Sequence, residues 1–215
     1  PTKTISSLFY ETVKMHRNNI SRKECDMKSA EIMEKLMLSD TQRILKSYPF
    51  ELSGGMCQRV AIALSMINSP KLILADEPTS ALDVTSQLQV VKQMKLLKEN
   101  FDKSLIIISH NFGVVAGLSD TVAIMYGGIF VEYGKTEEIL ENAVHPYTKA
   151  LIAAIPDMEG NVSKGLPGMP PSFTSIIKGC PFAERCTDCM PRCRHDEPED
   201  LYITQSHYVK CFLYQ

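Results

Sequence analysis

One stretch, from Leu52 to Asp83, carries residue types that bind phosphate and a hard cation. It opens with Leu52–Gly55, where a hydroxyl and two glycines precede a helical pattern, so backbone N–H groups at the positive end of a helix would face outward. A short apolar run, Leu72–Ala75, is typical of a buried parallel strand and ends in Asp76 and Glu77. The pattern predicts an anion site and a carboxylate pair at the carboxyl end of a strand.

Cysteines are concentrated near the end of the sequence. Five of the seven follow an irregular segment rich in proline and glycine, at Cys180, Cys186, Cys189, Cys193 and Cys211. Such clustering in a short, loop-like segment favours a metal or iron–sulfur site over unrelated core thiols. Cys25 and Cys57 are isolated, and we interpret them as buried thiols.

Helical patterns precede and follow the phosphate-binding turn. Apolar residues recur at helical spacing over Thr4–His16, and Ser21–Glu24 is typical of a capping box leading into Met27–Leu38. A third helix is expected from Gly55 to about Asn68, where Ser69-Pro70 would stop it.

A strand–helix–strand unit is predicted around the two acids. The helical pattern of Val84–Phe101 lies between the first apolar run and a second one, Leu105–Ile108, which leads into Ser109-His110. Parallel strands joined in this way end at the same edge of their sheet, so we expect His110 at the edge that carries Asp76 and Glu77. A short helix is expected next, then a hairpin of Thr121–Tyr126 and Ile129–Tyr133 joined through Gly127-Gly128.

Composition narrows the class of protein. The chain has 215 residues, 44% hydrophobic and 22% charged, which is typical of a globular protein with one sizeable core plus an appendage. A net charge of −2 argues against a general nucleic-acid binder. The apolar runs are strand-sized and no signal-peptide pattern is seen, so we expect an intracellular location, with cysteines that are thiols or metal ligands.

Several of these residues resemble the motifs of ABC-type ATPases. Ser53–Gln58 is similar to the signature motif, Leu72–Glu77 to the Walker B strand, Ser80–Asp83 to the D-loop and His110 to the switch histidine, in the same order and at fitting spacing. The resemblance implies an α/β fold: a partial P-loop-type ABC nucleotide-binding domain with a helical subdomain and a parallel-sheet core, followed by an irregular cysteine-rich C-terminal extension. The implied division is residues 1–52, 53–140 and 141–215.

The resemblance also implies roles for the site residues. Asp76 would help to hold Mg²⁺ through its water shell, Glu77 would be the general base for ATP hydrolysis, and His110 would contact the γ-phosphate. A nucleotide on a second ATPase subunit, paired head to tail, would be bound by the signature residues Ser53, Gly54, Gly55 and Gln58. Asp83 would link the two sites across that interface.

One motif of the family is not in the sequence. No G-x-x-x-x-G-K-[ST] loop occurs, and Pro1–Thr4 resembles the segment that follows the Q-loop. We therefore interpret the sequence as an N-terminally truncated fragment that would not hydrolyse ATP by itself. A non-catalytic, cluster-bearing module remains the alternative.

The tail favours one branch of the family. Glu141–Leu151 resembles the H-P-Y-T segment that opens the C-terminal extension of oligopeptide and dipeptide importer ATPases. This implies a peripheral subunit on the cytoplasmic face of the membrane, bound to transmembrane permeases and served indirectly by an extracytoplasmic solute-binding protein. Nickel or another small solute remains an alternative cargo, and the sequence does not say whether the two ATPases are identical.

The same resemblance gives the cysteines a role. Four of them match the pattern that holds a [4Fe–4S] cluster in some of these extensions, namely Cys180, Cys186, Cys193 and Cys211. Cys189 is additional, and its Cys-x-x-Cys spacing with Cys186 is one that zinc also accepts. Zinc and metal-free thiols therefore remain alternatives to the cluster.

Overall fold

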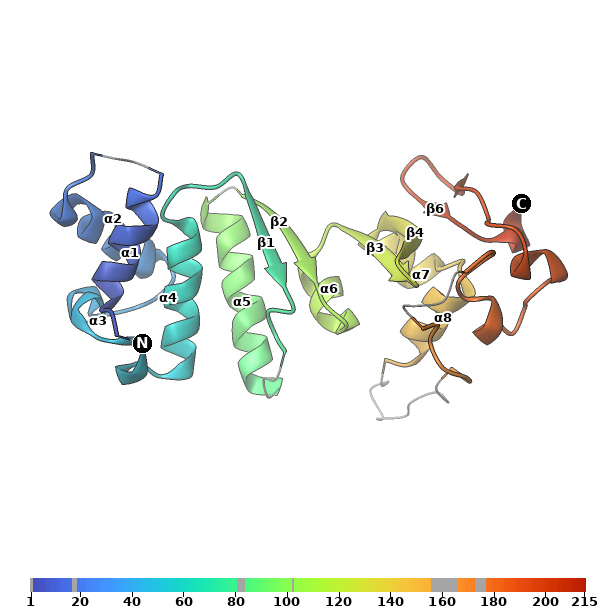
Figure 1. Ribbon diagram of the computed structural model, residues 1–215, viewed down its shortest axis with the longest axis horizontal. Helices are drawn as coiled ribbons and strands as arrows, with labels where there is room; N and C mark the ends of the chain where they lie inside the picture. The colour runs from blue at the N-terminus through green and yellow to red at the C-terminus, as the bar shows by residue number, and fades with distance from the viewer. Residues whose placement is uncertain (1, 17–18, 81–83, 102, 156–165, 173–176) are drawn as a thin grey trace. The chain divides into compact units, whose positions relative to one another are not determined.

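The computed structural model describes residues 2–16, 19–80, 84–101, 103–155, 166–172 and 177–215 (Figure 1). The chain forms two compact units, Pro1–Ser109 and His110–Gln215, and each is described by itself. None of the helices in the described ranges combines the length and apolar character needed to span a bilayer.

The first unit opens with a group of helices that pack around a common core. Phe9, Met33 and Ile44 are completely buried in it. The helices are α1 (Ile5–Lys14), α2 (Arg22–Lys35), α3 (Thr41–Lys46), the 3-10 turn η1 (Pro49–Glu51) and α4 (Gly54–Met66).

The predicted helix starts in this unit are confirmed. The hydroxyl of Thr4 caps α1 by accepting from the backbone N–H of Ser7, and Ser21 Oγ caps α2 by accepting from Glu24 N at 3.2 Å. Because the cap residue fixes the first turn, α2 starts at Arg22 rather than at Met27. Cys25 is buried as expected, whereas Cys57 is only partly buried and its Sγ donates to the Pro49 carbonyl.

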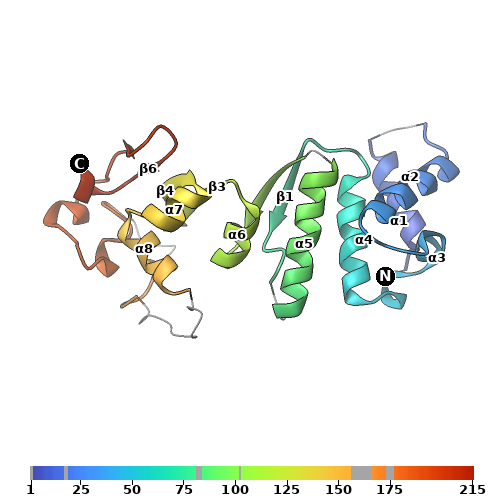
Figure 2. The same cartoon turned by 180° about the vertical axis from the view of Figure 1, so that it is seen from behind.

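A strand–helix–strand unit follows, as predicted. α5 (Val84–Phe101) connects β1 (Leu72–Asp76) to β2 (Ser104–Ile108), as Figure 2 shows from behind. The two strands are parallel, in a register that runs from Leu72 opposite Ser104 to Asp76 opposite Ile108. Their carboxyl ends therefore meet at one edge.

The expectation that these two strands are buried is wrong for the described part of the chain. Alternate side chains face solvent: Leu74 is 70% exposed and Ile108 57%. The physical reason is that β1 and β2 form a sheet of two strands in the described residues, so one face has no layer to cover it.

The second unit is built on an antiparallel sheet with the strand order β3-β4-β6-β5. The predicted hairpin is confirmed, with positive φ angles of 57° at Gly127 and 89° at Gly128 in its two-residue turn. Two short strands that sequence analysis did not predict, β5 and β6, extend this sheet. The elements are α6 (Phe112–Leu118), β3 (Thr121–Tyr126), β4 (Ile129–Lys135), α7 (Thr136–Asn142), α8 (Pro146–Ala153), β5 (Leu201–Tyr202) and β6 (Tyr208–Val209), with 3-10 turns η2 (Ala183–Arg185), η3 (Pro191–Arg194) and η4 (Phe212–Tyr214).

Phe182, from the cysteine-rich segment, completes the core of the second unit. It packs with Val122, Ile124, Tyr126 and Val131 of the hairpin, and its ring meets the Tyr126 ring edge-on at 5.1 Å. The segment is therefore part of a core and not a separate appendage.

We predict that Phe182→Ala lowers the free energy of unfolding of this unit by about 3–5 kcal/mol, because it removes a fully buried ring and leaves a cavity. Chemical denaturation followed by circular dichroism would measure the change. Phe130→Ala is the matched control: this phenylalanine on β4 is 46% exposed, and its loss should cost less than about 1 kcal/mol. Equal costs would contradict the assignment of Phe182 to the core.

Candidate functional sites

The carboxylate pair lies at the end of β1, where the chain turns sharply away from the sheet. Asp76 is the last residue of the strand, and Glu77 adopts a left-handed φ of 46°. The backbone N–H of Glu77 donates to the Ile108 carbonyl at 2.9 Å, which fixes the turn to the end of β2. Ser80 Oγ donates to Glu77 Oε2 at 3.3 Å. Such backbone geometry costs energy for a residue other than glycine and is common at functional sites.

The signature turn, residues 52–55, leads into α4 and is largely exposed to solvent. Ser53 Oγ caps the helix by accepting from Met56 N at 3.3 Å. Gly54 and Gly55 are exposed, and a Cβ added at Gly54 would meet nothing within 4 Å. The first backbone N–H groups of this helix are therefore accessible to an anion.

A direct contact joins α4 to the loop that follows the carboxylates. Gln58 Nε2 donates to the Pro78 carbonyl at 3.5 Å. α4 and β1 run in opposite directions, so the start of α4 and the end of β1 lie at the same end of the unit (Figure 1). The structure thus brings the start of α4 and the end of β1 together, a proximity that sequence analysis did not predict.

The two remaining site residues expected from the sequence are His110 and Asp83. His110 follows β2 by two residues and is exposed at the start of the second unit. The D-loop residue Asp83 lies outside the described residues.

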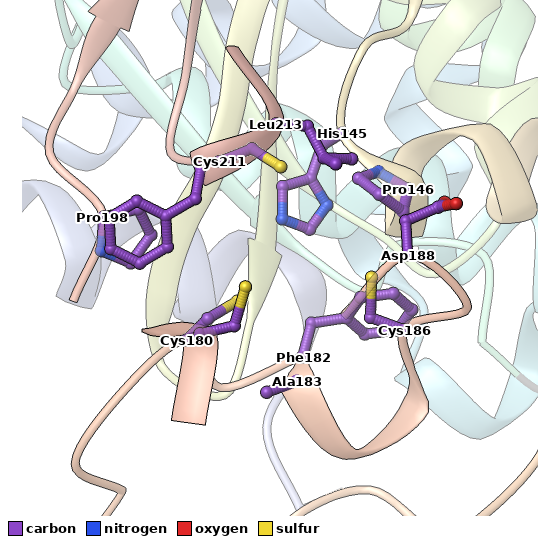
Figure 3. A pocket seen from close by; sticks show the side chains of 12 residues that line it. His145, Pro146, Cys180, Phe182, Ala183, Cys186, Asp188, Pro198, Cys211 and Leu213 are labelled. Atoms are coloured by element: carbon purple, nitrogen blue, oxygen red, sulfur yellow. The ribbon is translucent and has the colours of Figure 1, made fainter. Parts of the chain in front are cut away.

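A second site, which we call the cysteine pocket, lies in the second unit. The four cysteines Cys180, Cys186, Cys193 and Cys211 line it together with His145 and Asp188 (Figure 3). Cys189, the additional cysteine, does not line this pocket. The structure therefore separates the five clustered cysteines into four and one, the same division that the sequence pattern indicated.

Close backbone contacts bring two of these cysteines together. The Cys180 N–H donates to the Cys193 carbonyl at 2.8 Å. A Cβ at Gly179 would lie 2.3 Å from that carbonyl oxygen, so only glycine fits there. Sequence analysis missed Gly179; its position directly before Cys180 is the only signal that could have indicated it.

Burial favours the protonated form of three of the four thiols that line the pocket. It raises the pKa of Cys180 to about 11, and neighbouring cysteines add to the shift because thiolates would repel one another. Burial also raises the pKa of Cys186 and of Cys211. Deprotonation would therefore require a cation in the pocket.

A completely buried carboxylate fixes the turn before α8. Glu132 Oε1 accepts from His207 Nε2 and from Val144 N, both at 2.8 Å, and Oε2 accepts from His145 N at 3.1 Å. Sequence analysis did not single out Glu132 or His207. The signal that the sequence offered was the position of Glu132, an acidic residue within an otherwise apolar strand segment.

His145 is almost completely buried, with 1% of its surface exposed. Its Nδ1 accepts from the backbone N–H of Tyr147 at 3.1 Å, which caps α8. Burial lowers the pKa of His145 to about 4, against a smaller opposing effect of the Glu132 carboxylate.

In the described part of the chain, no group of three or more histidine, cysteine or acidic side chains is arranged to hold a single metal ion. The four cysteines nevertheless line one pocket.

Comparisons with known proteins match two segments of the chain. Residues 1–80 match the family described as ABC transporter, and residues 131–193 match the oligopeptide/dipeptide transporter C-terminal region. The chain is 38% identical to the oligopeptide transport ATP-binding protein AppD of Bacillus subtilis, over 100% of this chain and 66% of that protein. It is also 38% identical to OppD of Salmonella typhimurium, over 94% of this chain and 61% of that protein.

A solved structure is similar as well. The dimeric structure of MJ0796, a bacterial ABC transporter cassette, superposes with a TM-score of 0.51 at 28% identity, over 63% of this chain and 58% of that one. The chain belongs to the ATP-binding proteins of the ABC transporter family. Within that family it carries the C-terminal region of the oligopeptide/dipeptide transporters. It spans 66% and 61% of the length of the two relatives named above.

The lowered pKa of His145 predicts a pH-dependent stability for the metal-free chain. Above about pH 6.5 this histidine is neutral in both the folded and the unfolded state and contributes nothing. As the pH falls from 6.5 to about 4, the unfolded chain takes up a proton that the folded chain refuses, so the free energy of unfolding should fall by about 3 kcal/mol.

Chemical denaturation across this pH range would measure the effect. The other charged groups that face His145 are Glu132 and Asp188, so the informative quantity is the difference in slope between wild type and His145→Gln. His195→Gln, at an exposed position, is the control and should keep the wild-type slope. An unchanged slope in His145→Gln would show that another group causes the acid sensitivity.

Proposed function

We propose that the whole protein is the ATP-binding and ATP-hydrolysing subunit of an ABC importer for oligopeptides or dipeptides. The observation that carries this proposal is the edge of β1, where Asp76 and Glu77 lie at the strand end that Gln58 ties to the signature helix. The peptide cargo rests on the match of residues 131–193 and on the names of the relatives.

The chemistry proposed for this edge is phosphoryl transfer to water. The Asp76 carboxylate would hold Mg²⁺ through water, and the ion supplies charge neutralisation when bound. Glu77 would accept the proton of the attacking water, and its sharp turn would keep the carboxylate at the sheet edge. His110 would contact the γ-phosphate.

The partner of this subunit would be a second ATPase, paired head to tail. The exposed N–H groups of Ser53, Gly54 and Gly55 would bind the γ-phosphate of a nucleotide held by that partner, with Gln58 supporting the turn and Asp83 linking the two sites. Permeases would bind the pair at the cytoplasmic face of the membrane, supplied by an extracytoplasmic solute-binding protein.

The exposed apolar side chains of β1 and β2 fit this proposal. Side chains such as Leu74 are expected to lie inside a complete cassette, where further strands and helices cover both faces of a parallel sheet. We propose the functional division into residues 1–52, 53–140 and 141–215 because residues 1–80 match the ABC transporter family and residues 131–193 match the C-terminal region of the oligopeptide/dipeptide transporters.

We also propose that the cysteine pocket holds a [4Fe–4S] cluster, with Cys180, Cys186, Cys193 and Cys211 as ligands. One observation supports it: the four thiols line one pocket. Thiolates are the usual ligands of iron–sulfur clusters.

We predict that Glu77→Gln in the complete protein lowers the turnover of ATP by about 10²–10⁴-fold while ATP binding is retained, because the amide cannot accept the proton. Phosphate release and nucleotide binding would be measured side by side. Glu99→Gln, on the exposed side of α5, is the control and should hydrolyse ATP normally. Normal hydrolysis by Glu77→Gln would exclude Glu77 as the general base.

We predict that the anaerobically purified chain contains about four iron atoms and absorbs in the visible range as a [4Fe–4S] protein. Cys180→Ser should lose most of this iron, whereas Cys189→Ser should keep it, because Cys189 does not line the pocket. Iron, zinc and sulfide analysis would decide. The cluster would be ruled out by wild-type protein that contains zinc or no metal.

A further inference from the structure

Cys189, the additional cysteine, lies next to one of the four cysteines of the cysteine pocket. Cys193 lines the pocket and Cys189 does not, yet the two side chains are hydrogen-bond partners. Both side chains are partly exposed, and both thiols are free. Two thiols that touch and that solvent can reach are candidates for reversible oxidation, in contrast to an isolated buried thiol such as that of Cys25.

The backbone of Met190 brings the two sulfurs to one place. This residue is extended, with φ −96° and ψ 158°, so its N–H and its carbonyl point to the same side of the chain. The Met190 N–H donates to Cys193 Sγ at 3.4 Å, and the Met190 carbonyl accepts from Cys189 Sγ at 3.6 Å. Both sulfurs therefore lie beside the same edge of one residue.

The turn that follows holds Cys193 against this edge. The Met190 carbonyl also accepts from the Cys193 N–H at 3.0 Å, and η3 begins at Pro191, whose ring fixes its φ. Only three residues separate the two cysteines in the sequence. Because the loop between them is short and already folded, closing it with a covalent bond costs little further chain entropy.

Cys180 is the competing neighbour of Cys193. Its backbone N–H donates to the Cys193 carbonyl, and burial raises the pKa of its thiol to about 11. The thiolate is the form that attacks a disulfide, so Cys180 is a poor nucleophile near neutral pH. Burial also raises the pKa of Cys189, and Cys193 adds to that shift, whereas Arg194 opposes it. The direct contact between the two side chains therefore favours Cys189 over Cys180 as the partner of Cys193.

We propose that Cys189 and Cys193 are a redox-active pair that forms a reversible disulfide in the metal-free chain. The bond engages Cys193 and leaves Cys180, Cys186 and Cys211 as the free thiols of the pocket. The proposal depends neither on ATP hydrolysis nor on the iron–sulfur cluster. A cluster ligated by Cys193 and this disulfide exclude each other, so oxidation removes one thiol from the set of four.

The oxidant is a low-molecular-weight disulfide such as oxidised glutathione. The Cys189 thiolate attacks one of its sulfurs, forms a mixed disulfide and displaces one glutathione thiolate. The Cys193 thiolate then attacks the Cys189 sulfur and displaces the second glutathione thiolate. The two glutathione thiolates take up the two protons that the cysteines lose. The protein gives up two electrons, and the glutathione disulfide is reduced by them to two thiols.

The test is oxidation of the 215-residue chain, freed of metal with a chelator, by oxidised glutathione. The reaction is run at about pH 8.5, where an ordinary thiol is half ionised. We expect the number of free thiols, counted after denaturation, to fall by two from the seven of the reduced chain. Excess reduced glutathione should restore them.

Peptide mapping identifies the linked pair. Cleavage on the amino side of Asp188 and after lysine and arginine places four cysteines on four separate peptides, namely Cys180, Cys186, Cys189 and Cys193. Mass spectrometry without reduction should therefore find the peptide of Cys189 joined to that of Cys193.

Two variants provide the comparison. Cys189→Ser should keep all its remaining thiols free, whereas Cys57→Ser, at another partly buried cysteine, should form the same link as wild type. The proposal is overturned by wild-type protein that keeps all its thiols, that carries glutathione on Cys189 without the internal bond, or in which Cys193 is joined to another cysteine. The map of the wild-type protein decides between these outcomes even where a variant does not fold.

Discussion

The second unit depends on one buried carboxylate. Glu132 is fully enclosed and accepts from three N–H groups that belong to the His207 side chain and to the backbone of Val144 and His145. A buried carboxylate is tolerated only when such donors replace the water that it has lost. The same three bonds join β4, the segment that enters β6 and the turn before α8. The sheet therefore fixes the position of His145, which lines the cysteine pocket.

The first unit depends on a different constraint, the parallel pairing of β1 with β2. Parallel strands align their carboxyl ends, and the bond from Glu77 N to the Ile108 carbonyl extends this alignment one residue past β1. The sharp turn at Glu77 then leads into Pro78, whose carbonyl accepts from Gln58. The turn at Glu77 thus brings the loop after β1 into contact with α4, although Gln58 and Pro78 are twenty residues apart.

The elements that sequence analysis predicted well are those with local signals. The strand–helix–strand unit, the hairpin at Gly127-Gly128 and the helix start at Ser21 all follow from periodicity, turn residues or caps. The division of the clustered cysteines into four and one was also predictable, although only through resemblance to a family.

The features that were missed arise from contacts between distant residues. Glu132 and His207 are 75 positions apart, and no local pattern marks either as a partner of the other. Gly179 matters because of the Cys193 carbonyl, and the strand β6 exists because β4 offers it an edge. Sequence analysis did not predict the solvent exposure of Leu74 and Ile108. An apolar run indicates that a strand can be buried, but it does not show whether another layer of the structure covers that strand.

The distance in sequence between Glu132 and His207 has a consequence for biosynthesis. The β3–β4 hairpin can form as soon as it leaves the ribosome, but Phe182 and His207 are made 50 and 75 residues after Glu132. At translation rates of about 5–20 residues per second, the carboxylate and the apolar face of the hairpin wait several seconds for their partners. During that interval the nascent unit is an incomplete sheet with an open edge, a form that chaperones and neighbouring chains can bind.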